Sequence, residues 1–204
     1  MDEVKKDNTE EKILEAAKTV FIKKGMDGSR MQEIADEAGI NKALLHYYFR
    51  SKQKLFEAIF SNVLKQIFPD IKALITSEKP IEDKIKIFVE KYTGLLLKNP
   101  YLPSFLLKEL HRDPEFPASV IRSQGVNPNE LFNMLKKEME AGKIRKMNPR
   151  DLMTNILALS IFPFAAKPML QILFFDNNPN EYNEFLVNRK ETVKSFILNS
   201  ILIK

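Results

Sequence analysis

Helical spacing of the apolar residues is the feature that most restricts the fold of this 204-residue chain. Nearly every apolar run repeats at intervals of three and four residues, and no stretch alternates as a half-buried β-strand would. Glycine occurs only 6 times, and most of the 11 prolines stand between the apolar runs, where they separate helices. The pattern therefore predicts an all-α protein.

The helices group into two units. Residues 1–50 are predicted to form a compact three-helix domain, of which residues 1–7 are disordered, and residues 51–204 a larger helical domain. A long helix that begins at Ser51 and ends or bends near Pro69 joins the two. The stretch 113–127 has no clear pattern. Helices are predicted over residues 8–24, 29–38, 41–48, 51–69, 81–98, 103–112, 128–141, 149–174 and 181–203.

Composition argues against enzyme chemistry. The chain has no cysteine and 2 histidines, no glycine-rich phosphate loop and no cluster with zinc-ligand spacing, so we expect no catalytic residues, metal site or cofactor. The net charge of +5 fits a polyanionic partner without requiring one. The polar start of the sequence lacks a secretory signal, which favours a cytoplasmic location.

Residues 152–175 are apolar and, at roughly 20 residues, long enough to cross a bilayer. The segment nevertheless contains Asn155, Pro163 and Lys167, and a central lysine costs about 2.5–3.5 kcal/mol on insertion. We therefore expect a helix buried by protein, and no membrane association.

Residues 29–49 have the features of a helix-turn-helix. Gly39 can adopt the left-handed turn conformation between the two short helices, and Ala35 permits their close approach. Asn41 can cap the second of these helices. Residues facing inward are predicted to form a small core with the first helix: Ile34, Ala38, Ile40, Leu45 and Tyr48.

The outward face of the 41–48 helix differs from an ordinary solvated surface. It presents Lys42, His46 and Tyr47, which can donate hydrogen bonds to phosphates or base edges, and a small Ala43 that permits close approach. Residues 39–56 include four basic side chains and no acidic one, whereas residues 2–37 contain ten acids. A solvated helix face or buried tyrosines are the alternatives for these residues.

The same region resembles the DNA-binding domain of the TetR (tetracycline-repressor-like) family of bacterial regulators. The similarity covers about residues 10–57, through ILEAAKTVFIKKG, MQEIADEAGI and NKALLHYYFRSKQKLF, and the YYF-x-SK-x-x-L ending is the most characteristic part. Leu44 and His46 depart from the residues common there, Thr and Tyr, so the resemblance indicates no particular operator.

The resemblance implies a function for each matching position. Ser29 and Arg30 would contact the DNA backbone, and Tyr48 and Lys52 would meet phosphates or support the helix. The 41–48 helix would enter the major groove of a palindromic double-stranded operator. The predicted DNA-binding residues are Ser29, Arg30, Asn41, Lys42, Ala43, His46, Tyr47, Tyr48 and Lys52.

A single three-helix domain makes few base contacts, so a homodimer is expected, held together by a four-helix bundle of the last helices. An intramolecular core is the alternative for these residues. The predicted interface residues are Ala158, Ile161, Phe162, Ala165, Val193, Phe196, Ile197 and Ser200.

The larger domain has more apolar residues than a DNA-binding domain needs, which favours a pocket for a small apolar or amphipathic ligand. The resemblance implies that such a ligand releases a repressor from its operator. A nucleoid-binding protein without ligand control and a helical carrier without DNA binding are the alternatives. The candidate pocket residues are Phe88, Tyr92, Phe105, His111, Met134, Asn155 and Phe162.

Overall fold

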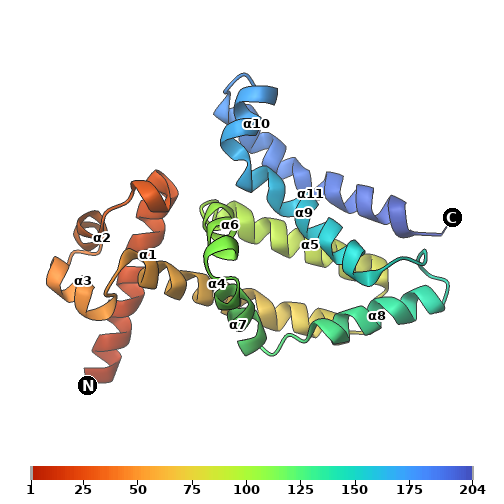
Figure 1. Cartoon of the computed structure of the whole chain (residues 1–204), viewed down its shortest axis with the longest axis horizontal. Coiled ribbons are helices and arrows are strands. Elements are labelled where there is room, and N and C mark those ends of the chain that lie inside the picture. The colour runs from red at the N-terminus through yellow and green to blue at the C-terminus, as the bar shows by residue number, and fades with distance from the viewer. Residues whose placement is uncertain (1, 204) are drawn as a thin grey trace. The chain divides into compact units, whose positions relative to one another are not determined.

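A computed structural model of the chain describes residues 2–203, with side chains for residues 8–203 (Figure 1). Over this range the chain is helical without a strand, which confirms the all-α class. The predicted disorder of residues 1–7 lies outside the described side chains. The helices are α1 (Asp2–Gly28), α2 (Met31–Glu37), α3 (Lys42–Tyr48), α4 (Lys52–Thr76), α5 (Ile81–Lys98), α6 (Leu102–Arg112), α7 (Glu115–Ser123), α8 (Pro128–Glu140), α9 (Pro149–Ala165), α10 (Lys167–Phe174) and α11 (Pro179–Ile201).

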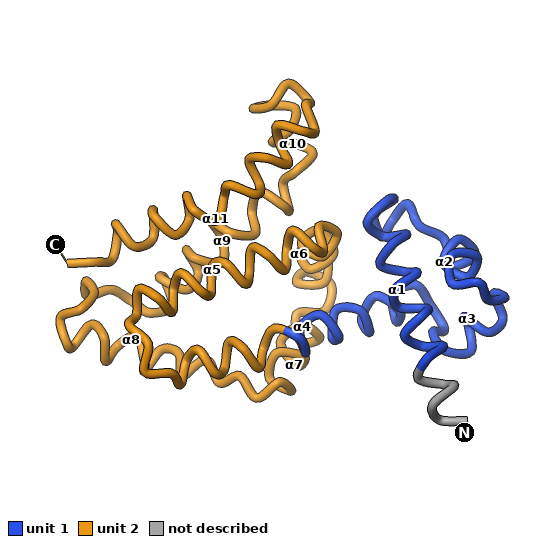
Figure 2. Tube along the Cα trace, turned by 180° about the vertical axis from the view of Figure 1, so that it is seen from behind, with its two compact units in different colours: residues 1–66 blue, residues 67–204 orange. Residues whose placement is uncertain are grey.

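The chain divides into two compact units, a head of residues 1–66 and a body of residues 67–204 (Figure 2). The boundary predicted after residue 50 would lie just before α4. The observed division instead falls inside α4, after residue 66. The first half of α4 belongs to the head because its apolar side chains pack there, with the Phe56 ring 5.4 Å from that of Phe21. The head thus includes the half of α4 that follows the helix-turn-helix.

The core of the head consists mainly of apolar residues. Ile13, Ala17 and Phe21 of α1 are buried together with Ile34 of α2 and Leu45 of α3, as their helical spacing predicts. Gly25 (φ 67°) interrupts α1 one turn before its end. Gly39 (φ 65°) takes the predicted left-handed conformation between α2 and α3, so the chain can reverse without side-chain strain.

In the body, α5 packs against both α9 and α11, and α9 also contacts α6, α8 and α10 (Figure 1). Aliphatic residues that face inward from these helices form the core, including Val89, Ile156, Val193 and Ile197. Glu90 of α5 is paired with Lys190 (2.6 Å) and Lys194 of α11, so hydrogen bonds from two lysines keep the pKa of its carboxyl below the usual range.

The structure differs from the sequence-based expectation near three prolines. Pro69 lies on the exposed side of α4, which continues to Thr76. The predicted 149–174 helix is instead two helices bent by 75°, because Pro168 at the start of α10 cannot continue α9. Within 113–127, α7 begins directly after Pro114. No single helix in the described chain is long and apolar enough to span a membrane; only the bent α9–α10 pair passes that test.

Candidate nucleic-acid interface

Helix α3 is short, well capped and exposed along one side. The Asn41 side-chain oxygen accepts a hydrogen bond from the Leu44 amide at 2.8 Å, which fixes the start of the helix as predicted. Leu45 is completely buried and holds α3 to the head. Lys42, Ala43 and His46 are exposed, so the side of α3 opposite Leu45 is free for a partner.

Tyr47 is the large aromatic residue exposed on this side. Its side chain is 71% exposed, which excludes the alternative that it is a core aromatic. Tyr48 is half-buried, and its ring meets that of Tyr47 edge to face with centroids 5.5 Å apart. Tyr48 therefore supports the orientation of Tyr47, while the Tyr47 hydroxyl is exposed to solvent.

The charges around α3 are positive. Lys42 and Arg50 are exposed, and the nearest acids along the chain are Glu37 before the turn and Glu57 in α4. Lys54, at the start of α4, forms a 2.7 Å ion pair with Glu57 and remains 68% exposed. A polyanion approaching α3 therefore meets cationic and neutral groups first.

Ser29, predicted to contact the DNA backbone, is buried in the head. The side chain is only 3% exposed, and its hydroxyl donates to the Met26 carbonyl at 2.7 Å. Nor does Ser29 cap α2; that position belongs to Arg30, whose amide donates to the Glu33 carboxylate at 3.1 Å. Ser29 is thus a turn residue, because its hydroxyl is used inside the turn between α1 and α2.

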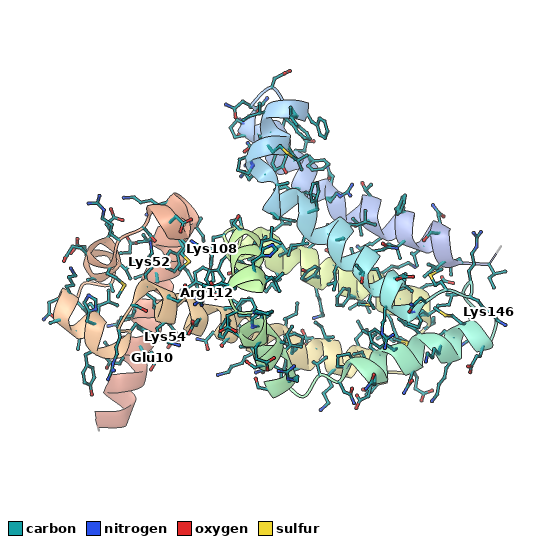
Figure 3. The ribbon with its side chains drawn as sticks, viewed as in Figure 1. Glu10, Lys52, Lys54, Lys108, Arg112 and Lys146 are labelled. Atoms are coloured by element: carbon teal, nitrogen blue, oxygen red, sulfur yellow. The ribbon has the colours of Figure 1, made fainter. Side chains whose placement is uncertain are left out.

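Lys52 is also occupied within the head. Its ammonium donates to the carbonyls of Met26 (2.6 Å), Ser29 (2.9 Å) and Asp27 (3.4 Å), and the side chain is half-buried (Figure 3). Three carbonyl acceptors match the three donors of a lysine. Of the two predicted roles, phosphate contact or support, the geometry favours support.

Arg30 remains available at the N-terminal end of α2, and its side chain is exposed. Glu33, which accepts the Arg30 amide, also accepts a 2.9 Å hydrogen bond from Lys24. The Lys24 hydrogen bond, aided by that of the Arg30 amide, lowers the pKa of the Glu33 carboxyl. The negative charge of Glu33 at this corner is therefore offset by Lys24.

The body contains an apolar pocket between the last turns of α4 and helices α5, α8 and α9, with a cavity volume of about 50 Å³. Of the predicted ligand residues, only Phe88 and Met134 line it. Tyr92 stacks on Phe88 with ring centroids 5.8 Å apart, and burial raises the pKa of its hydroxyl to about 12.

The other ligand candidates lie elsewhere. Phe105 is buried in α6, and His111, Asn155 and Phe162 are exposed to solvent because they occupy the outer faces of their helices. Sequence reasoning missed Lys84, which is 7% exposed and lines the pocket. The sequence did contain a signal for this position. Lys84 is spaced with Ile81, Ile85 and Phe88 so that all four lie on the apolar face of α5.

The predicted dimer interface separates into two sets. Val193 and Ile197 are 1% and 2% exposed and pack in the core of the body, so they cannot contact a second copy in this structure. Phe162 (54%) and Phe196 (62%) are exposed, as are Ala158 and Ser200, while Ile161 and Ala165 are half-buried. Four further apolar side chains of α10 are exposed: Met169, Ile172, Leu173 and Phe174.

A helix-turn-helix with an exposed, acid-free second helix, followed by a larger helical body, defines a DNA-binding transcriptional regulator. Residues 13–59 match the family described as bacterial regulatory proteins, tetR family. The chain is 40% identical over 183 residues to the HTH-type transcriptional repressor NicS of Pseudomonas putida, a match that covers 88% of this chain and 81% of NicS.

Solved structures share the fold. A transcriptional regulator of the TetR/AcrR family from Thermobifida fusca superimposes with a TM-score of 0.66 at 17% identity, over 94% of this chain and 97% of that one. The TetR-family regulator PfmR from Thermus thermophilus gives 0.64 at 19% identity, over 90% and 97%. The chain belongs to the TetR family of bacterial regulatory proteins, which are regulators and not enzymes.

Proposed function

We propose that the protein is a cytoplasmic, homodimeric repressor that binds a palindromic operator and leaves it when a small apolar or amphipathic ligand enters the body. The observation that carries this proposal is the outward side of α3, where a 71% exposed tyrosine stands among cationic and small residues. The name of NicS, a transcriptional repressor, supports repression over activation.

The proposed base-reading residues are Lys42, Ala43, His46 and Tyr47. The major groove admits an α-helix, and lysine, histidine and tyrosine can donate to base edges or phosphates while Ala43 lets the helix approach. Arg30 and the Asn41 end of α3 would contact the backbone on either side. Tyr48 and Lys52 would act indirectly, by holding α3 and the α1–α2 turn.

The proposed dimer interface is the exposed apolar surface of α9, α10 and α11. Phe162 lies near the end of α9 and Phe196 near the end of α11, two helices that pack together, and four more apolar side chains are exposed on α10. Large exposed apolar areas are unusual on monomers and typical of interfaces. Two copies related by a twofold axis would present two heads to a palindrome.

The proposed ligand site is the apolar pocket lined by Phe88 and Met134. Its walls include Ile71, Leu74 and Ile75 of α4, a helix whose first half belongs to the head. A ligand that favours a different position of these residues would therefore act on a helix shared with the DNA-binding unit.

Selection of bound fragments from genomic DNA by the purified protein tests the proposal. We expect one or a few palindromic sites near promoters; occupancy spread over the genome would indicate the nucleoid-binding alternative, which the match to a repressor does not favour. Tyr47→Ala and Lys42→Ala should weaken binding without loss of helicity, whereas Lys146→Ala, an exposed lysine of the body, serves as control. A monomer that binds no duplex in dilute salt would contradict the proposal.

A further inference from the structure

Lys84 is a buried charge in an otherwise apolar wall. Of the twelve residues that line the pocket, the other eleven are apolar. Its ammonium donates to the Ile75 carbonyl at 3.1 Å, and among the residues whose side chains are described it forms no ion pair. Lysine is seldom buried without an anionic partner, because removing its charge from water is costly.

Lys84 lies where the apolar pocket meets a second, polar groove. The residue lines the apolar pocket and also an adjoining polar groove, and Ile75, Ile81 and Met134 are shared by the two. Besides Lys84, the groove is lined by three lysines and four glutamates, and its Glu138 forms an ion pair with Lys143 at 3.0 Å. Of the described residues, Lys84 is the one charged residue that lines both the pocket and the groove.

We infer that the ligand is an amphipathic anion: a slender apolar chain occupies the pocket, and a carboxylate at its end pairs with Lys84. This inference rests on the proposed ligand control and specifies the chemical class of the ligand. A carboxylate would give the buried ammonium the charged partner that it lacks, and such hydrogen bonds are about twice as strong as neutral ones. A cation would be repelled, and a neutral molecule would leave Lys84 unpaired.

The hydrogen bond from Lys84 to the Ile75 carbonyl also connects the ligand site to α4. Ile75 lies in the last turn of α4, where carbonyls have no partner within the helix, and Lys84 supplies one. A carboxylate that draws the Lys84 ammonium away would free the Ile75 carbonyl. Binding of the anion therefore changes how the end of α4 is held.

The test compares three probes of equal chain length on the full-length protein: decanoate, decanol and decyltrimethylammonium, each below its micelle concentration. Calorimetry should show that decanoate binds most tightly. Lys84→Met should weaken decanoate by about thirtyfold or more, as expected when one partner of a buried charge pair is removed, and leave decanol unchanged. Lys79→Met, which removes an exposed lysine of the groove, is the matched control.

Several results would overturn the inference: decanoate binding no tighter than decanol, no binding by any probe, or unaltered decanoate affinity in Lys84→Met. If Lys84→Met fails to fold, the comparison of decanoate with decanol on the unaltered protein still tests the inference. DNA selection is independent of these measurements, so a failure here leaves operator binding by α3 intact, and the two failures are distinguishable.

Discussion

Replacing Lys52 by methionine separates two roles that the sequence leaves open, a contact to a DNA phosphate and a contribution to the stability of the head. Methionine keeps most of the length of the side chain and removes its three donors. The structure assigns all three to carbonyls of the turn between α1 and α2. The substitution should therefore act on the free energy of unfolding more than on the DNA contact.

The magnitude follows from the distances. Hydrogen bonds to a charged group contribute roughly 1.5–3 kcal/mol each. We count the two shorter bonds, to Met26 (2.6 Å) and Ser29 (2.9 Å), at the lower limit because Lys52 is only half-buried and water can replace part of each. Lys52→Met should then lower the free energy of unfolding of the head by about 3 kcal/mol.

Two measurements check this expectation. Hydrogen exchange across α1 and α2, together with urea unfolding followed by circular dichroism, reports stability. Operator affinity at several salt concentrations reports phosphate contacts, since removal of one lysine–phosphate pair reduces the slope of log affinity against log salt by about 0.9. We expect lower stability and an unchanged slope.

Lys54→Met is the matched control, because Lys54 is 68% exposed and its single ion pair with Glu57 should contribute less than about 1 kcal/mol. If Lys52→Met left exchange and unfolding unaltered while the salt slope fell by about 0.9, Lys52 would be a phosphate contact and our reasoning would be refuted.

Three further predictions concern the turn, the dimer and pH. Gly39→Ala should destabilise the head by roughly 1–2 kcal/mol in urea unfolding, because φ is 65° there; an equal loss in Gly39→Asn would contradict this backbone explanation. Phe162→Asp with Phe196→Asp should yield monomers in sedimentation; an intact dimer would exclude this surface. Glu90→Gln should lower stability by less than about 1 kcal/mol near neutral pH. Because folding lowers the pKa of Glu90, the difference from the unaltered protein should vanish as acid protonates it.

The head could be predicted in detail because its signals are local. An asparagine cap, a glycine at a left-handed turn and the spacing of Ile34 and Leu45 determine α2 and α3 within a few residues of sequence. The role of Lys52 could not be derived in this way, because its acceptors, the carbonyls of Met26, Asp27 and Ser29, lie 23 to 26 residues earlier in the chain.

The body was less predictable because its apolar residues face more than one way. Val193 and Ile197 share one side of α11 and Phe196 and Ser200 another, and both sides have helical spacing. Sequence alone gives no reason to assign the first pair to the core and the second to the surface. That choice depends on which side of α11 meets α5 and α9.

Helix α4 carries both Lys52, which holds the turn between α1 and α2, and Ile75, which lines the proposed ligand pocket. Lys52, in its first turn, holds the carbonyls of Met26 and Ser29, and Ile75, in its last turn, is held by Lys84. A displacement of α4 that starts at its Ile75 end would thus act on the turn between α1 and α2 through Lys52. Coupling of this kind requires that both ends bias one shared element, and α4 is a single helix across residues 52–76. Decanoate should therefore raise hydrogen exchange in α4 and around residues 26–29; a change confined to α3 would exclude this route.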